Sequence, residues 1–303
     1  MKEKVLILIL LVSGFLMEIP GNAQDPKVIA SAKDKKYKKE WKTVDSLDRL
    51  GLPKSALEIV NKIYNLAKTD KNNDQIIKSL MYRMKYLNDS EEDIFEQLFK
   101  DMDAEISESS LPNRHLLHSM KAEMFWMYYR NNRYQILNRT NTIGYQSDDI
   151  KTWTLDQLLD KVIRHYLLSL KEKDSLFKTD LKIYDEIISF GHDARKLRPS
   201  LYDFLASRAF QFFSSTELTM NRPADFFQLK EEFYFAQPED FINSKISTSD
   251  SLSLHYNAIL ILKDWLTFRM ADTNTAALVD LDLSRLSFVY NKSVNANKES
   301  LYL

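Results

Sequence analysis

The feature that most constrains this chain is a shortage of glycine combined with helical periodicity. Of its five glycines, only Gly51, Gly144 and Gly191 follow residue 23, and the sequence has no cysteine. Apolar residues recur at helical spacing through nearly all of the remaining chain. Phosphate-binding loops need clustered glycines, tight β-hairpins need glycine at positive φ, and zinc or redox sites usually need thiolates. The composition therefore predicts an all-α chain and disfavours most enzyme classes.

The first residues have the pattern of a secretory signal peptide. A charged start, Met1–Lys4, precedes the apolar run Val5–Met17, and small residues at Gly21 and Ala23 suit cleavage before Gln24. The run is shorter than the roughly 18–20 residues that span a bilayer, although an uncleaved anchor is the alternative. No cysteine is present to carry a lipid anchor. We expect an exported mature chain, periplasmic or extracellular, that does not insert into a membrane.

The charge balance argues against nucleic acid or anionic membrane as a bulk partner. The chain has 42 basic and 43 acidic residues, and its formal net charge is −1. Basic residues cluster only at Lys33–Lys42. We interpret that cluster as a flexible, solvent-exposed segment that precedes the first helix rather than as a binding patch.

The predicted organisation is an array of antiparallel helical hairpins, either a solenoid like that of tetratricopeptide repeats or an irregular bundle. The first hairpin is the clearest, because Gly51 ends one helix and Pro53 opens the next. Small residues at Gly51 and Ala56 would let the two backbones approach. The ranges expected are a signal peptide at 1–23, a disordered leader at 24–36, a helical-hairpin domain at 37–213, an ordered irregular excursion at 214–250 and a further hairpin at 251–303.

Periodicity predicts the individual helices. Thr154 or Thr152 is expected to cap one of them, Ser90 another, and Gly191 to close a short one. The expected helices cover 37–50, 53–67, 76–87, 94–106, 114–130, 155–170, 180–190, 200–213, 252–270 and 275–292. Apolar residues near Leu303 look like the start of a further helix, so we expect the natural protein to be longer than this chain.

Histidines are the first candidates for a metal site. His115 and His118 lie three residues apart on a predicted helix, as paired ligands would, but Glu123 is spaced to point elsewhere. We interpret the pair as structural. His165, His192 and His255 are isolated and are expected to pack between helices. The sequence thus predicts no metal, cofactor or catalytic residue.

Three other patterns also favour structural roles. No serine lies in a nucleophile turn. Acidic pairs could supply the two carboxylates of a glycosidase, but at helix starts they usually complement the helix dipole; they are Glu91-Glu92-Asp93, Asp148-Asp149 and Glu231-Glu232. The aromatic and basic block Tyr128–Tyr134, with Arg139, resembles a single-strand binder, yet we expect its arginines to meet helix carbonyls. Arginines of Arg195–Pro199 are expected to tie a loop to acidic helix ends.

Several segments in order resemble a known family. They are Trp41…Asp45-Ser46-Leu47…Gly51-Leu52-Pro53-Lys54-Ser55-Ala56-Leu57, Ala122–Tyr129 running to Ile136–Thr140, Asp149–Trp153, and Arg195–Ala206. Together they resemble the helical region that follows the signal peptide in large alpha-2-macroglobulin-like proteins of Bacteroidota, over about residues 40–213. In that family, β-sandwich domains, a bait segment and often a thioester segment follow. None of those parts is in this chain, and no family functional residue carries over.

The resemblance implies a function without catalysis in this region. We expect a helical interaction or positioning module of an exported protease-trapping protein, whose partners are downstream macroglobulin domains, proteases or envelope proteins. The alternative is a free-standing periplasmic adaptor that binds a peptide or an envelope protein. A helical polysaccharide-degrading enzyme is the third and least favoured, since it needs two carboxylates about 5–10 Å apart in a cleft.

Overall fold

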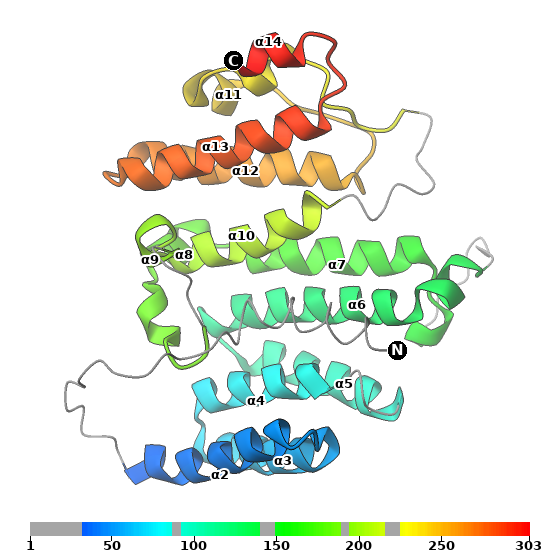
Figure 1. Cartoon of the computed structure of the whole chain (residues 1–303), viewed down its shortest axis with the longest axis vertical. Coiled ribbons are helices and arrows are strands. Elements are labelled where there is room, and N and C mark those ends of the chain that lie inside the picture. Colours follow the sequence, from blue (N-terminus) through cyan, green and yellow to red (C-terminus); the bar gives the residue numbers. More distant parts are fainter. Residues whose placement is uncertain (1–31, 87–91, 140–148, 189–193, 216–224) are drawn as a thin grey trace. The chain divides into compact units, whose positions relative to one another are not determined.

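The computed structural model describes residues 32–86, 92–139, 149–188, 194–215 and 225–303 (Figure 1). Regular structure in these ranges is helical, apart from an isolated antiparallel bridge between Asp180 and Ser200. The predicted all-α class is therefore confirmed. The expected signal peptide, most of the expected leader, the Ser90 cap, Gly144 and the Gly191 stop lie outside the described residues.

The chain divides into two compact units that are interleaved along the sequence. The N-terminal unit contains the described residues up to Arg139 and the later segment 182–188, whereas the C-terminal unit contains 149–181 and everything described from residue 194 onward. A short segment in the middle of the chain thus belongs to the fold of the first helices.

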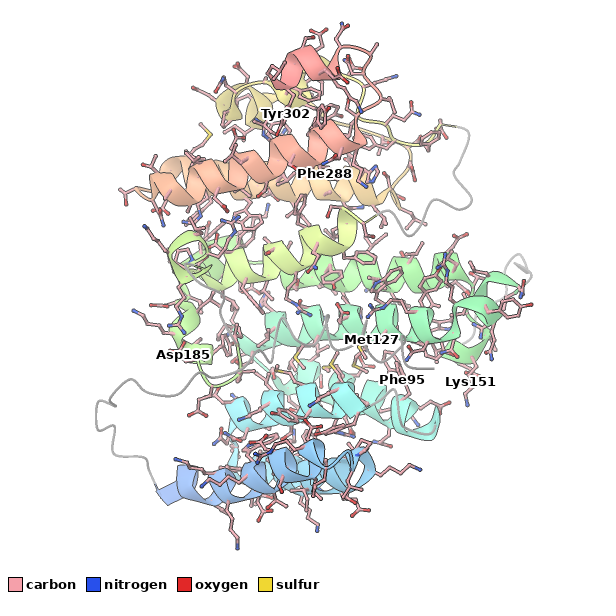
Figure 2. The ribbon with its side chains drawn as sticks, in the orientation of Figure 1. Phe95, Met127, Lys151, Asp185, Phe288 and Tyr302 are labelled. Atoms are coloured by element: carbon pink, nitrogen blue, oxygen red, sulfur yellow. The ribbon has the colours of Figure 1, made fainter. Side chains whose placement is uncertain are left out.

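Five helices build most of the N-terminal unit, stacked in sequence order (Figure 1). They are α2 (Ala32–Arg49), α3 (Pro53–Asp70), α4 (Asn73–Lys85), α5 (Glu92–Glu108) and α6 (Asn113–Leu137). Helix α2 begins at Ala32, inside the range 24–36 that was expected to be disordered. Aromatic rings pack between α5 and α6. The ring centroids of Phe95, labelled in Figure 2, and Tyr128 are 5.3 Å apart, and those of Phe99 and Phe125 are 4.7 Å apart.

Gly51 ends α2 for a different reason from the one expected. Its φ is +68°, the left-handed conformation that closes a helix, and the amides of Gly51 and Leu52 donate to the carbonyls of Asp48 and Leu47. A Cβ at Gly51 would meet nothing within 4 Å. Backbone approach therefore does not require glycine here, whereas the positive φ does.

The connection between α3 and α4 uses the same geometry without glycine. Lys71 has φ +53°, and the amides of Lys71 and Asn72 donate to the carbonyls of Lys68 and Ala67. Asn72 then caps α4, because its side chain accepts from the Gln75 amide at 3.3 Å. Two residues thus finish one helix and start the next.

Helix α6 continues past the end that the sequence predicted at residue 130. Asn132 leaves helical geometry, with φ −112° and ψ 16°, and its side-chain nitrogen Nδ2 donates to the Tyr128 carbonyl at 3.0 Å. Beyond this kink Ile136 is only 2 % exposed. Burial of Ile136 explains why the chain stays helical through a polar stretch.

The described part of the C-terminal unit contains shorter helices as well as four long ones, of which α7 and α10 lie in one layer and α12 and α13 in the next (Figure 1). Thr154 caps α7 through a reciprocal pair of bonds with Gln157, so the predicted Thr154 cap is confirmed. The elements are η2 (Ile150–Thr152), α7 (Leu155–Ser169), α8 (Lys173–Lys178), α9 (Ala194–Leu197), α10 (Leu201–Phe213), η4 (Glu232–Phe235), α11 (Pro238–Asn243), α12 (Leu254–Ala271), α13 (Thr275–Lys292) and α14 (Lys298–Tyr302).

The short helix expected at 180–190 is wrong as to its extent. Among its described residues, 180–188, only a 3-10 turn, η3 (Leu181–Tyr184), forms, and the amides of Ile187 and Ile188 both donate to the Tyr184 carbonyl at 2.8 Å. Tyr184 is 1 % exposed, and its hydroxyl donates to Asn113 Oδ1 at 2.6 Å. The apolar spacing that suggested a helix instead buries a compact turn against the start of α6.

Candidate functional site

The most enclosed charged group in the described residues is Asp203, in the first turn of α10. Its carboxylate is fully buried and faces Arg269 and Trp265 of α12. Oδ1 accepts from Trp265 Nε1 at 2.7 Å and from Arg269 Nε at 3.2 Å. Oδ2 accepts from Arg269 Nη2, from the Ser200 amide at 2.9 Å and from the Ser200 hydroxyl at 2.6 Å. We call these four residues the Asp203 cluster.

Each partner in the Asp203 cluster is itself fixed by its helix. Ser200 is the N-cap of α10 and forms a capping box with Asp203, so the local sequence Ser200-x-x-Asp203 places the carboxylate. Arg269 is 1 % exposed and also pairs with Asp272, which ends α12. Beside the cluster, Arg198 lies 4.8 Å from the Trp265 ring and pairs with Asp280 of α13.

The chemistry open to the Asp203 cluster is limited by these bonds. A carboxylate that accepts five hydrogen bonds and carries a paired guanidinium has little capacity left to bind a substrate proton or a metal. The same bonds join α10 to α12 across the centre of the C-terminal unit. The arrangement is therefore a structural link between helices.

Arg285 of α13 forms a second buried link, to the irregular segment before α12. Nη1 donates to the Tyr234 carbonyl at 2.6 Å, Nη2 donates to the Ala236 carbonyl at 2.8 Å, and Nε donates to Asp282 Oδ1 at 2.7 Å. The guanidinium also lies 4.6 Å from the Phe241 ring. One arginine thus satisfies the carbonyls that η4 leaves open.

A third polar group joins α3, α4 and α5 in the N-terminal unit. Arg83, 6 % exposed, pairs with Asp101 at 2.6 Å and lies 5.0 Å from the Tyr64 ring. Tyr64 donates its hydroxyl to Glu105 at 2.7 Å, and Lys68 pairs with Glu105 at the same distance. Burial, followed by the Glu105 hydrogen bond and charge, raises the pKa of Tyr64 above its usual range.

Two nitrogens of Arg83 remain without a protein partner. Nε and Nη1 are buried and make no hydrogen bond to the described residues, and neither does the Ser79 hydroxyl one turn earlier on α4. Donors of this kind are ordinarily met by ordered water. Apart from these atoms, the group has the same role as the Asp203 cluster, since it connects helices that follow one another in the stack.

The predicted histidine pair lies on α6. His115 is 3 % exposed, and His118 is partly buried. Burial, together with the nearby charges of His115, Lys121 and Arg114, lowers the pKa of His118 to about 4. Among the described residues no group of three or more histidine, cysteine, aspartate or glutamate side chains could hold a metal ion. His165 and His255 are partly buried, and His192 lies outside the described residues.

The structure describes only some of the residues of the acidic pairs. Asp149 caps η2, since its Oδ1 accepts from the Lys151 amide at 2.9 Å. Glu231 and Glu232 are exposed at the start of η4. Asp148 and the side chains of Glu91-Glu92-Asp93 lie outside the description.

The aromatic and basic block of α6 does not form one surface. Tyr128 and Tyr129 are buried, and Tyr129 stacks on Trp126 with 4.8 Å between ring centroids, whereas Tyr134 is 83 % exposed. Arg130 approaches Glu123 at 3.4 Å. In the second basic block, the pairing of Arg198 with Asp280, near the start of α13, agrees with the expected tie between loop and helix.

The sequence did not single out the residues that form the buried links. Asp203 falls within the segment Arg195–Ala206 that carries the family resemblance, whereas no motif of the sequence marks Arg269 or Arg285. A usable signal was present, because an arginine at a core-facing position of an apolar helix needs a buried acceptor. The acceptors come from residues distant in sequence, which periodicity does not reveal.

Comparisons with protein-family models, with curated proteins and with solved structures return no match. Within the described part of the chain, no helix combines the length and the apolarity that crossing a membrane requires.

Proposed function

We propose that this chain is a non-catalytic helical module, exported from the cell, that positions or binds protein as part of an alpha-2-macroglobulin-like protease-trapping protein. The observation that carries the proposal is the use of its buried charged side chains. Asp203, Arg269, Arg285 and Glu105 all make contacts that connect helices. Side chains committed in this way support a scaffold role.

The family part of the proposal rests on the ordered segments that resemble the macroglobulin-like proteins. The last of those segments, Arg195–Ala206, contributes Arg198, Ser200 and Asp203 to the links within the C-terminal unit. Their structural use gives a physical reason for a helical region of this kind to require these residue types.

The test is removal of residues 24–303 from a longer natural protein that carries this region, followed by measurement of export, thermal stability and protease capture. The proposal predicts that capture falls while any remaining protein is still exported. Unchanged export, stability and capture would contradict a positioning role.

The second candidate is a free-standing periplasmic adaptor for a peptide or envelope protein. An exposed apolar pair favours it, because Val279 is 52 % and Leu283 is 60 % exposed one turn apart on α13. The coding sequence after Leu303 separates the two candidates. Macroglobulin-like β domains there support the trapping protein, and a stop codon supports the adaptor.

A further inference from the structure

The exposed face of α2 carries a concentrated positive charge. Lys36, Lys38, Lys39 and Lys42 are exposed, and Glu40 is the sole acidic residue between the first and the last of them. Spacings of three and four residues place these lysines along one side of the helix. We call the four residues the lysine face.

The protein itself neutralises little of this charge. Lys36 lies 3.7 Å from Asp70, but that carboxylate also accepts from the Tyr37 hydroxyl at 2.7 Å. Lys38, Lys39 and Lys42 form no ion pair with any described residue.

The arrangement also works against the helix that carries it. Lys38 and Lys42 are like charges four residues apart, which destabilises a helix. The charge of Lys38, Lys39 and Lys42 is therefore available to an external anion.

The rings of α2 point away from the lysine face. Tyr37 is 1 % exposed and Trp41 is 7 % exposed, and Trp41 Nε1 donates to Gln75 of α4 at 2.6 Å. A single-stranded nucleic acid would need exposed rings for base stacking, and a protein partner usually binds through a buried aromatic or arginine anchor. A row of lysines without such an anchor suits an extended anionic surface, where each lysine contributes independently.

We propose that the lysine face of α2 holds the protein on the surface of an anionic lipid membrane, peripherally and through charge alone. The location of the lysine face supports this occupant. Before the expected cleavage, the apolar run of the signal peptide ends at Met17, and a chain from there to Lys36 reaches on the order of 65 Å at most. Export would thus release the lysine face close to a membrane. The inference goes beyond the proposed function and rests on it only for the expected export; the vesicle experiment below tests membrane binding separately from export and protease capture.

The experiment is sedimentation of the protein with vesicles of phosphatidylcholine alone or mixed with phosphatidylglycerol. The triple variant Lys38→Gln, Lys39→Gln and Lys42→Gln removes three charges while keeping good helix formers. The matched control changes the exposed residues Lys62, Lys171 and Lys245 to Gln, with the same loss of net charge. Circular dichroism verifies that both variants are folded.

We expect the wild type and the control to bind the mixed vesicles and not phosphatidylcholine alone, and added salt to weaken the binding. The triple variant should bind about 100-fold more weakly, from about 1 kcal/mol for each lysine. Equal binding by all three proteins, or no binding by the wild type, would overturn the proposal. So would binding to soluble polyglutamate in place of vesicles, because that result assigns the lysine face to an acidic protein.

Discussion

At the scale of single residues, whether an ionised group can be buried depends on the partners that surround it rather than on its residue type. Arg269 and Arg285 are each 1 % exposed, yet their guanidinium groups meet carboxylates, carbonyls and rings. A buried cation is tolerated only with such partners. From sequence, a core-facing position on an apolar helix signals that each arginine needs a buried acceptor but not which one, because Asp203 and the Tyr234 carbonyl lie about fifty or more residues away.

The environment of His118 opposes protonation of its imidazole. Its pKa is about 4 in the folded protein and 6.5 in the unfolded chain, so the unfolded chain binds more protons between these values. The stability that neutral His118 contributes is complete above pH 6.5 and is lost as the pH falls toward 4. We expect the wild type to lose about 1–2 kcal/mol more than His118→Gln between pH 7 and 4.5, after allowance for solvent screening. Urea unfolding at both pH values measures this, and equal losses would contradict it.

At the scale of elements, local signals predicted a capped helix start well, but the start of α2 at Ala32 and the end of α6 at Leu137 less well. Thr154 is found where the sequence placed a cap, because capping depends on neighbours three residues away. The end of α6 was predicted too early, since the burial of Ile136 is a tertiary effect. The turn at Tyr184 was mistaken for a helix because its apolar spacing also fits a buried turn.

The α3–α4 connection gives a prediction for Lys71, whose φ of +53° is costly for any residue except glycine. Lys71→Gly should stabilise the protein by about 0.5–1 kcal/mol. The control is Lys62→Gly on the exposed side of α3, which should destabilise by about 1 kcal/mol. Chemical denaturation provides both numbers, and a loss of stability for Lys71→Gly would show that the left-handed geometry is not under strain.

The irregular segment before α12 depends on Arg285. Arg285→Met removes the donors for the Tyr234 and Ala236 carbonyls, so we expect a loss of about 3 kcal/mol and faster hydrogen exchange across residues 232–243. Lys292→Met is the control, because it removes a partly exposed cation from the same helix, keeps both carbonyl contacts of Arg285 and should cost about 1 kcal/mol or less. If exchange in 232–243 stays slow in Arg285→Met, the segment is held by its rings instead.

At the scale of the whole molecule, the fold class followed from composition, but the division into units did not. Helical periodicity and three glycines after residue 23 were sufficient for an all-α prediction. The return of residues 182–188 to the N-terminal unit rests on contacts such as Tyr184 with Asn113, which are seventy-one positions apart. No local pattern reports a contact of that range.

The interleaving predicts how fragments behave. A fragment of residues 32–139 lacks the segment 182–188, whose side chains Tyr184, Ile187 and Ile188 are buried. We therefore expect this fragment to have a much lower melting temperature than the same fragment with residues 182–188 attached through a flexible linker. The difference should be on the order of 10 °C for a loss of about 2 kcal/mol. Thermal melts followed by circular dichroism measure it, and identical melting temperatures would mean that the segment is not part of this unit.

The central claim is that the enclosed polar groups of the described residues hold helices together. The most direct test is the unfolding free energy of Asp203→Asn beside that of the double variant Asp203→Asn with Arg269→Met, with Asp272→Asn as the partly exposed control. A structural link predicts a loss of about 3–5 kcal/mol for Asp203→Asn, recovery of at least half of it in the double variant, and about 1 kcal/mol or less for the control. A loss below about 1 kcal/mol for Asp203→Asn would contradict the claim.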